Sequence, residues 1–207
     1  MTSAIQARVV VIAGPSGSGK SRLAERTGLP VLRLDDFYKD GDDPTLPRIP
    51  EGSANAGLVD WDHPSSWLED DAFTAMATLC REGAVDVPIY DIAHNGRTGW
   101  QHLDLQGAAH FVADGIFAQE IVPRAREAGL LADALCLRQH PAITFWRRLT
   151  RDLREHRKPP LVLLRRGLAL MRAQSGVVDH AVALGCRPLA NQRALDDVAG
   201  LVAAARG

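Results

Sequence analysis

The stretch Gly14-Pro15-Ser16-Gly17-Ser18-Gly19-Lys20-Ser21 spells G-x-x-x-x-G-K-S and directly follows the apolar run Val9–Ala13. When a buried strand leads into such a turn, the backbone N–H groups of the turn point into a small concavity. The helix that follows adds the positive end of its dipole. Lys20 can then reach the β- and γ-phosphates of a nucleotide, and the Ser21 hydroxyl can bind Mg²⁺. The pattern predicts a nucleoside triphosphate site formed by Gly14, Ser16, Gly17, Ser18, Gly19, Lys20 and Ser21.

The overall composition is that of an ordinary globular protein. The 207 residues are 46% hydrophobic and 24% charged, with a formal net charge of −1. This length favours a single domain, 1–207, and the charge balance gives no basic field for nucleic acid or an anionic membrane. The three cysteines have no disulfide or zinc spacing, which suits a reducing compartment. The start of the chain has no signal-peptide pattern, so we expect a cytoplasmic protein, and a homo-oligomer is compatible with these features.

Strand-like and helix-like segments alternate along the chain. The expected strands are Arg8–Ala13, Val31–Leu34, Val85–Tyr90, Ala109–Asp114 and Ala134–Arg138. The expected helices are Lys20–Thr27, Ser65–Arg81, Phe117–Ala128, Ala142–His156, Leu161–Ala173 and Asn191–Arg206. With the glycine-rich turn, this order predicts an α/β fold, a P-loop NTPase three-layer sandwich with a central, mainly parallel five-stranded sheet, whose sites lie at the carboxyl ends of the strands.

Two long connections interrupt this alternation, at about 36–64 and 91–106. The first is rich in Gly, Pro and Asp, and both follow the carboxyl ends of expected strands. Long connections in a compact domain are either functional or disordered, and their position here favours substrate-binding loops.

Acidic residues end two of the expected strands. Asp35 and Asp36 follow the second strand, where a carboxylate would lie near the γ-phosphate, accept the proton of an attacking hydroxyl and face Mg²⁺. Capping of a turn is an equally good explanation for such a pair. Asp114 ends the fourth strand in the manner of a Walker B acid that binds Mg²⁺, although Asp-Gly is also a common turn.

A basic cluster occupies Arg147–Lys158 and runs into Pro159-Pro160. On a helix these side chains could form a solvated face with i,i+4 charge pairs. We favour a helical lid at about 147–160, because the rest of the chain is nearly neutral and arginines can close over a transferring phosphoryl group.

Four blocks, taken in order, resemble the uridine kinase family of P-loop kinases, a group that also includes phosphoribulokinase and bacterial pantothenate kinase. The blocks are Gly14–Ser21, Asp35-Asp36-Phe37-Tyr38, Asp62-His63-Pro64 and Pro88-Ile89-Tyr90-Asp91. The resemblance implies Asp35 as catalytic base, Asp62 as ligand of the ribose hydroxyls, and Tyr90 as an aromatic of the base pocket. It also implies that Arg148 and Arg151 contact substrate and phosphate from the lid.

The chain departs from the family pattern at several positions. Asp114 stands where the family usually has Glu, which shortens the arm to the metal. The family places a base-reading His five residues beyond the tyrosine, whereas His94 is four residues beyond Tyr90, so that His94 or Asn95 could occupy that place. Trp61, beside Asp62, is equally compatible with stacking on substrate and with burial in the core.

The resemblance implies an ATP-dependent kinase, with Mg²⁺, whose partner is a small molecule. The favoured reaction is phosphorylation of the 5′-hydroxyl of uridine or cytidine. Another nucleoside, a pantothenate-like alcohol or a sugar phosphate is the alternative acceptor, and a non-kinase nucleotide switch is a further alternative. A GTPase would require an N-K-x-D element, which this sequence lacks.

Overall fold

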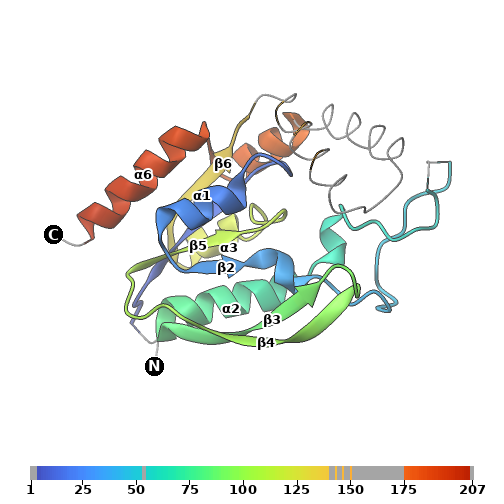
Figure 1. Ribbon diagram of the computed structural model, residues 1–207, viewed down its shortest axis with the longest axis horizontal. Coiled ribbons are helices and arrows are strands. Elements are labelled where there is room, and N and C mark those ends of the chain that lie inside the picture. Colours follow the sequence, from blue (N-terminus) through green and yellow to red (C-terminus); the bar gives the residue numbers. More distant parts are fainter. Residues whose placement is uncertain are drawn as a thin grey trace.

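The computed structural model describes residues 4–52, 55–139, 143, 146, 150 and 175–205. At its centre is a five-stranded sheet with the order β2-β5-β1-β6-β7, and every pairing in it is parallel (Figure 1). The strands are β1 (Arg8–Ala13), β2 (Val31–Arg33), β5 (His110–Asp114), β6 (Leu131–Leu137) and β7 (Arg187–Leu189). The predicted α/β class and the parallel five-stranded sheet are therefore confirmed.

Strand β1 lies in the middle of the sheet and is buried on both faces. Val9, Val11 and Ala13 belong to one hydrophobic cluster, whereas Val10 and Ile12 belong to another. The first cluster includes residues of α2 (Glu69–Glu82) and α3 (Val122–Glu127), and the second includes residues of α1 (Lys20–Thr27) and α6 (Asn191–Ala204). A strand covered on both faces needs a continuous apolar run rather than alternation, which is the pattern that β1 has.

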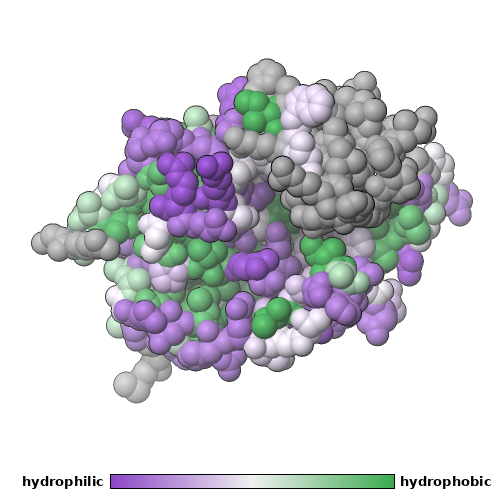
Figure 2. All heavy atoms as spheres, viewed as in Figure 1, coloured by the Kyte–Doolittle hydropathy of each residue, from purple (hydrophilic) through white to green (hydrophobic). Residues whose placement is uncertain are grey.

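Two further strands form an antiparallel hairpin outside the central sheet. They are β3 (Ala84–Asp91) and β4 (Gly96–Asp104), and the hairpin lies alongside α2 (Figure 1). The surface over the hairpin is mixed, with hydrophobic and intermediate residues among hydrophilic ones (Figure 2), and Ile89, Ile92 and Trp100 are exposed. The hairpin extends one wall of the molecule beyond the carboxyl ends of the strands.

Three expectations about the strands need correction. The predicted strand at Val85–Tyr90 forms, but it belongs to the hairpin and not to the central sheet. Most of the segment 91–106, expected to be a loop, is strand β4, whose polar side chains carry no buried alternation and whose order comes from pairing with β3. The fifth strand of the sheet is β7. It has only three residues, too few to give a recognisable strand pattern in the sequence.

Several helical segments also differ from expectation. The chain from Pro64 to Ser66 forms a 3-10 turn, η2, and α2 begins only at Glu69. The segment predicted as a helix at Phe117–Ala128 is helical only from Val122 to Glu127. Another 3-10 turn, η1, covers Leu34–Phe37 directly after β2.

Much of the carboxyl-terminal third has no description in this structure. The helices expected at Ala142–His156 and Leu161–Ala173, and with them the proposed lid, lie outside the described residues, apart from positions 143, 146 and 150, which are helical. Residues 175–183 are helical. Within the described ranges, no helix has the length and apolar character needed to cross a bilayer.

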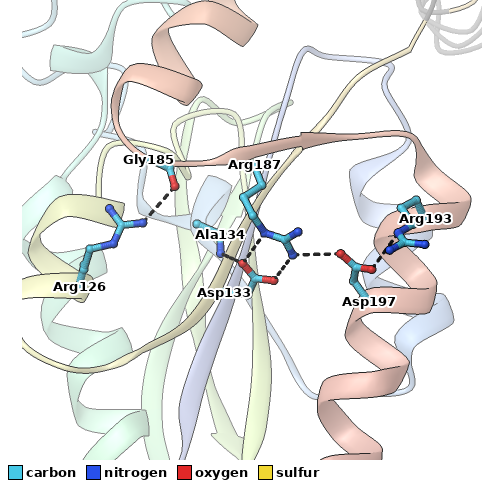
Figure 3. Close-up of polar contacts among 7 residues, drawn as sticks. All are labelled: Arg126, Asp133, Ala134, Gly185, Arg187, Arg193 and Asp197. Atoms are coloured by element: carbon cyan, nitrogen blue, oxygen red, sulfur yellow. Dashed lines mark hydrogen bonds and ion pairs between the residues drawn. The ribbon is translucent and has the colours of Figure 1, made fainter.

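A group of charged side chains links the edge strand β7 to its neighbour β6 and to helix α6 (Figure 3). The Arg187 guanidinium pairs with Asp133 of β6 and lies 3.0 Å from Asp197 of α6, which also pairs with Arg193 at 3.2 Å. Burial of Ala194 and Val198 against Leu23 of α1 adds an apolar contact. The last strand and the last helix are thus fixed to both the sheet and the helix that follows the glycine-rich turn.

Candidate active site

The glycine-rich turn connects β1 to α1 at the carboxyl edge of the sheet. Gly14 has φ 137°, and a Cβ there would lie 2.9 Å from the Leu137 carbonyl oxygen of β6. Only glycine allows this close approach of two backbones. Gly19 has φ 94° and directly precedes α1, whose amino-terminal N–H groups therefore face the turn. This backbone geometry is compatible with the anion-binding turn that the sequence predicts.

Lys20 lies inside this turn and is only 9% exposed. Its Nζ donates hydrogen bonds to the carbonyl oxygens of Gly14, at 2.9 Å, and Pro15, at 3.4 Å. These bonds hold the ammonium group within the concavity that the backbone N–H groups surround. A lysine in this place can exchange a carbonyl for a phosphate oxygen without leaving the loop.

Asp114 ends β5 next to the turn and is 8% exposed. Burial raises the pKa of this carboxyl group, while the Lys20 ammonium and the Ser21 hydroxyl act in the opposite direction. Its Oδ1 atom is buried and has no hydrogen-bond partner among the described residues. An unpartnered buried carboxylate oxygen beside a serine hydroxyl is chemically suited to a hard cation, so Ser21 and Asp114 fit Mg²⁺.

A magnesium site of this kind does not require a cluster of protein ligands. Among the described residues no group of three or more His, Cys, Asp or Glu side chains is arranged to bind a metal. Mg²⁺ in phosphate-binding sites is held by one or two protein oxygens together with phosphate oxygens and water. One carboxylate and one hydroxyl are sufficient for that arrangement.

Asp35 and Asp36 lie side by side in η1 but face different parts of the molecule. Asp35 Oδ1 accepts a hydrogen bond from the Ile116 backbone N–H, at 2.8 Å, in the loop that follows Asp114. Asp36 is 4% exposed, accepts a 3.4 Å bond from the Tyr90 backbone N–H, and burial raises the pKa of its carboxyl group. Of the two, Asp35 is the acid that lies near Asp114 and the glycine-rich turn.

Gly115 permits that position of Asp35. A Cβ on Gly115 would lie 2.8 Å from Leu34 Cβ and 3.0 Å from Asp35 Oδ1. Because Arg33 of β2 pairs in register with Asp114 of β5, the residues that follow both strands meet at this point. The sequence Asp114-Gly115 is therefore a close contact between two strand ends as well as a turn.

Aromatic side chains gather around Tyr38, three residues beyond Asp35. The Tyr38 ring centroid lies 5.8 Å from those of Trp61 and Tyr90 and 5.9 Å from that of Phe117. The Tyr38 hydroxyl donates to the Trp61 carbonyl at 3.2 Å, which brings the stretch containing Asp62 toward this group. Trp61, which the sequence left open, is a half-buried member of this aromatic group.

The histidine of the Asp-His-Pro block has a structural role. His63 Nδ1 accepts a hydrogen bond from the Ser65 backbone N–H and so caps η2, which leaves Asp62 exposed just before the turn. The side chain of Asp62 is therefore on the surface of the loop, on the same stretch as Trp61.

The turn of the hairpin carries His94 and packs on the segment after Tyr38. His94 Nδ1 lies 2.6 Å from Asp91 Oδ2, and the bond lowers the pKa of Asp91. Asn95 has φ 48°, and its carbonyl accepts a 2.6 Å bond from the Gly41 N–H. The Asn95 backbone is thus held against the opposite loop, while Asn95 and the His94 side chain, which is 72% exposed, both lie at the surface.

The structure brings together most of the predicted site residues that it describes. Lys20, Ser21, Asp35 and Asp114 meet at the carboxyl edge of the sheet, with Tyr90 beyond Asp36. Arg148 and Arg151 lie outside the described residues. The sequence did not reveal two contacts here, the approach of Asp35 to Gly115 and a bond from Asn191 to the turn. A glycine after an acidic strand end was the only available signal, and for Asn191 there was none.

Comparison with known proteins gives consistent relatives, although no protein-family model matches the chain. A uridine kinase from Deinococcus deserti is 29% identical over 182 residues, which are 83% of this chain and 81% of that protein. A uridine kinase from Leuconostoc citreum is 29% identical over 71% of this chain and 69% of its own length. A uridine kinase from Schizosaccharomyces pombe is 31% identical over 70% of this chain, but over only 32% of the longer yeast protein.

A solved structure extends this likeness to the fold. A candidate fructose transport system kinase from Silicibacter is 20% identical, with a TM-score of 0.58 over 89% of this chain and 88% of that one. Together with the parallel sheet, the glycine-rich turn and the adjacent acids, these matches define a P-loop kinase, a phosphotransferase with a hydroxyl acceptor and ATP as co-substrate. Within that class, the chain is similar to uridine kinases over most of its length.

Substitution of Gly115 by alanine tests whether the close approach of Asp35 matters for turnover. The added Cβ must displace Leu34 and the Asp35 carboxylate, and a misplacement of about 1 Å in a reacting group can cost up to about 10²-fold in rate. We expect Gly115→Ala to lower kcat at least about 10-fold with little change in ATP affinity. Gly200→Ala is the matched control, because nothing lies within 4 Å of that position. An unchanged kcat in Gly115→Ala would show that the close approach of Asp35 to Gly115 does not matter for turnover.

The buried carboxylate of Asp114 should oppose folding of the ligand-free protein. Since its pKa is raised, the folded state loses stability relative to the unfolded state as the pH rises through that pKa, and below the unfolded pKa this loss vanishes. We expect Asp114→Asn to raise the ligand-free Tm at pH 7.5, by about 2–4 °C for each kcal/mol relieved. The gain should shrink as the pH falls toward 5, while activity drops about 10²-fold or more. A lower Tm at pH 7.5, or a gain independent of pH, would contradict this account.

Proposed function

We propose that this enzyme transfers the γ-phosphate of ATP to the 5′-hydroxyl of a pyrimidine ribonucleoside, uridine or cytidine. The observation that supports the proposal is that Asp35 lies close to Asp114, bonds to the Ile116 N–H and precedes by three residues Tyr38 of the aromatic group. A carboxylate in that position can contact a hydroxyl that lies in line with the γ-phosphate. The reduced thiols of Cys80, Cys136 and Cys186, all buried, suit a cytoplasmic setting.

The reaction divides among residues of this chain. Backbone N–H groups of the turn and the Lys20 ammonium hold the phosphates. Asp35 takes the proton of the acceptor hydroxyl while the hydroxyl oxygen bonds to the γ-phosphorus. The bond between the γ-phosphorus and the β–γ bridging oxygen breaks, and ADP leaves. When bound by Ser21 and Asp114, Mg²⁺ supplies positive charge to the phosphates.

The Ile116 N–H bond has a direct consequence for the proposed base. It binds one oxygen of Asp35 and so fixes the orientation of the carboxylate, which leaves the second oxygen to receive the proton. A positioned base of this kind typically accounts for a factor of about 10²–10⁴ in rate. Asp36 is turned toward the hairpin by its contact with Tyr90 and is a poor alternative.

Residues of the loop before η2 and of the hairpin supply the acceptor site in this proposal. In this proposal the Asp62 carboxylate binds the ribose diol, Tyr90 lies against the base, and the exposed His94 contacts the base edge from the hairpin turn. The bond from Asp91 orients His94, and the backbone bond between Gly41 and Asn95 holds the turn on the opposite loop. Arg148 and Arg151 would contact the transferring phosphoryl group.

A different acceptor is the second candidate, favoured by one observation. His94 stands four residues beyond Tyr90, and at the fifth position the Asn95 backbone is bonded to Gly41. If the base contact depends on the fifth position, the pocket will instead accept another nucleoside, a pantothenate-like alcohol or a sugar phosphate.

The test is ADP formation with a panel of acceptors at fixed Mg-ATP. The panel contains uridine, cytidine, 2′-deoxyuridine, adenosine, guanosine, pantothenate and fructose 6-phosphate. We expect turnover with uridine or cytidine, weaker turnover with 2′-deoxyuridine because one hydroxyl partner of Asp62 is missing, and negligible ADP formation without acceptor. Faster turnover with any other class of acceptor contradicts the proposal, and equal ATP hydrolysis without acceptor contradicts kinase activity.

Replacement of Asp35 by asparagine separates the proposed base from its neighbour. Asp35→Asn keeps the shape and the acceptor for the Ile116 N–H but cannot take a proton, so kcat should fall about 10²-fold or more with ATP affinity unchanged. Asp36→Asn is the matched control and should keep kcat within about threefold. The opposite order of effects would move the base to Asp36.

A further inference from the structure

Asn191, the first residue of α6, makes a contact across the sequence to the phosphate-binding turn. Its Nδ2 donates a 3.0 Å hydrogen bond to the Ser18 carbonyl oxygen, and its Oδ1 accepts a 3.1 Å bond from Gln139 Nε2. Gln139 follows the carboxyl end of β6, so one amide links the turn, the sheet and the last helix. Nothing in the chemistry of the reaction described above uses Asn191.

The Ser18 carbonyl controls the direction of the next N–H group. In a trans peptide the carbonyl of Ser18 and the N–H of Gly19 point to opposite sides of the same plane. A bond that holds the carbonyl toward α6 therefore turns the Gly19 N–H away from α6. Gly17 and Gly19 both have positive φ, 84° and 94°, and glycine adopts either sign of φ at little cost, so this peptide has weak intrinsic preference.

Asn191 itself is firmly held. Strand β7 pairs with β6 just before it, and the Arg138 N–H donates to the Leu189 carbonyl at 2.8 Å. The Arg187 guanidinium joins β7 to Asp133 and Asp197, as Figure 3 shows, and α6 packs on α1 through Ala194 and Val198. The side chain that contacts Ser18 is thus attached to rigid elements rather than to a loop.

We propose that Asn191 is a positioning residue for the phosphate-binding turn. It holds the Ser18–Gly19 peptide so that the Gly19 N–H faces the ATP phosphates. The Ser18 side chain is next to this peptide, and its buried Oγ has no partner within the described residues. The inference rests on ATP use by the turn and is independent of which hydroxyl compound is phosphorylated.

The substitution Asn191→Asp isolates the donor. Aspartate has the same shape, keeps an oxygen for Gln139 and is favoured at a helix amino terminus, so the fold should be as stable as before. It loses only the N–H group directed at Ser18 and sets a carboxylate oxygen against that carbonyl. We expect at least a 10-fold weaker Kd for Mg-AMPPNP and an equally raised KM for ATP, with kcat and the acceptor KM within about threefold.

Two control variants separate geometry from charge. Gln192→Asp adds the same negative charge one residue further on, where the exposed side chain bonds to Asp196 of its own helix. It should change Kd less than about twofold. Asn191→Ala removes the donor without adding charge and should weaken binding about 3- to 10-fold.

Calorimetric titration with Mg-AMPPNP and with tripolyphosphate shows which part of the ligand loses contacts in the Asn191 variants, the phosphates or the nucleoside. If Asn191 positions the turn, the Asn191 variants lose affinity for both ligands by similar factors, with the ligand-free Tm unchanged. A loss for AMPPNP alone would assign Asn191 to the nucleoside end and overturn the proposal. Equal losses in Gln192→Asp would reduce the effect to charge, and unchanged binding in Asn191→Ala would show that the bond does not matter. Because these titrations contain no acceptor, they do not depend on the acceptor panel.

Discussion

Parallel pairing of β5 between β1 and β2 is the constraint on which the active site depends. It places Ile12 beside Asp114 on one side and Arg33 beside Asp114 on the other. Parallel strands end at the same edge of the sheet. Three features therefore meet there directly: the phosphate-binding turn after β1, Asp114 at the end of β5, and the proposed base Asp35 after β2. A shift of one residue in either pairing would turn Asp114 to the other face of the sheet.

From the same arrangement we expect the site to oppose folding. The Asp114 carboxylate is buried and therefore desolvated, and Lys20, Ser21 and Arg33 offset that in part. Asp35 adds negative charge nearby. Such crowding of acids is unfavourable without a cation and becomes favourable when phosphate-bound Mg²⁺ is present. A loss of folding stability and a site suited to Mg-ATP thus arise from one cluster.

The sequence was informative where local signals and the fold agree. The apolar run into G-x-x-x-x-G-K-S gave β1, the turn and α1, and the carboxylate at the end of β5 lies where it was expected. It failed where order comes from pairing alone: β4 is polar and exposed, and β7 has three residues, so neither carries a periodic pattern. The different directions of Asp35 and Asp36 also could not be predicted, since they depend on contacts with Ile116 and Tyr90, which are distant in sequence.

The central claim is that Asp35 receives the proton of the acceptor hydroxyl. A crystal structure of the enzyme with Mg-AMPPNP and uridine measures this most directly. The account predicts the uridine 5′-oxygen within about 2.6–3.2 Å of an Asp35 carboxylate oxygen and in line with the γ-phosphate, with Asp62 on the ribose hydroxyls. A 5′-oxygen against Asp36 or remote from both acids, or uridine bound elsewhere, would contradict it.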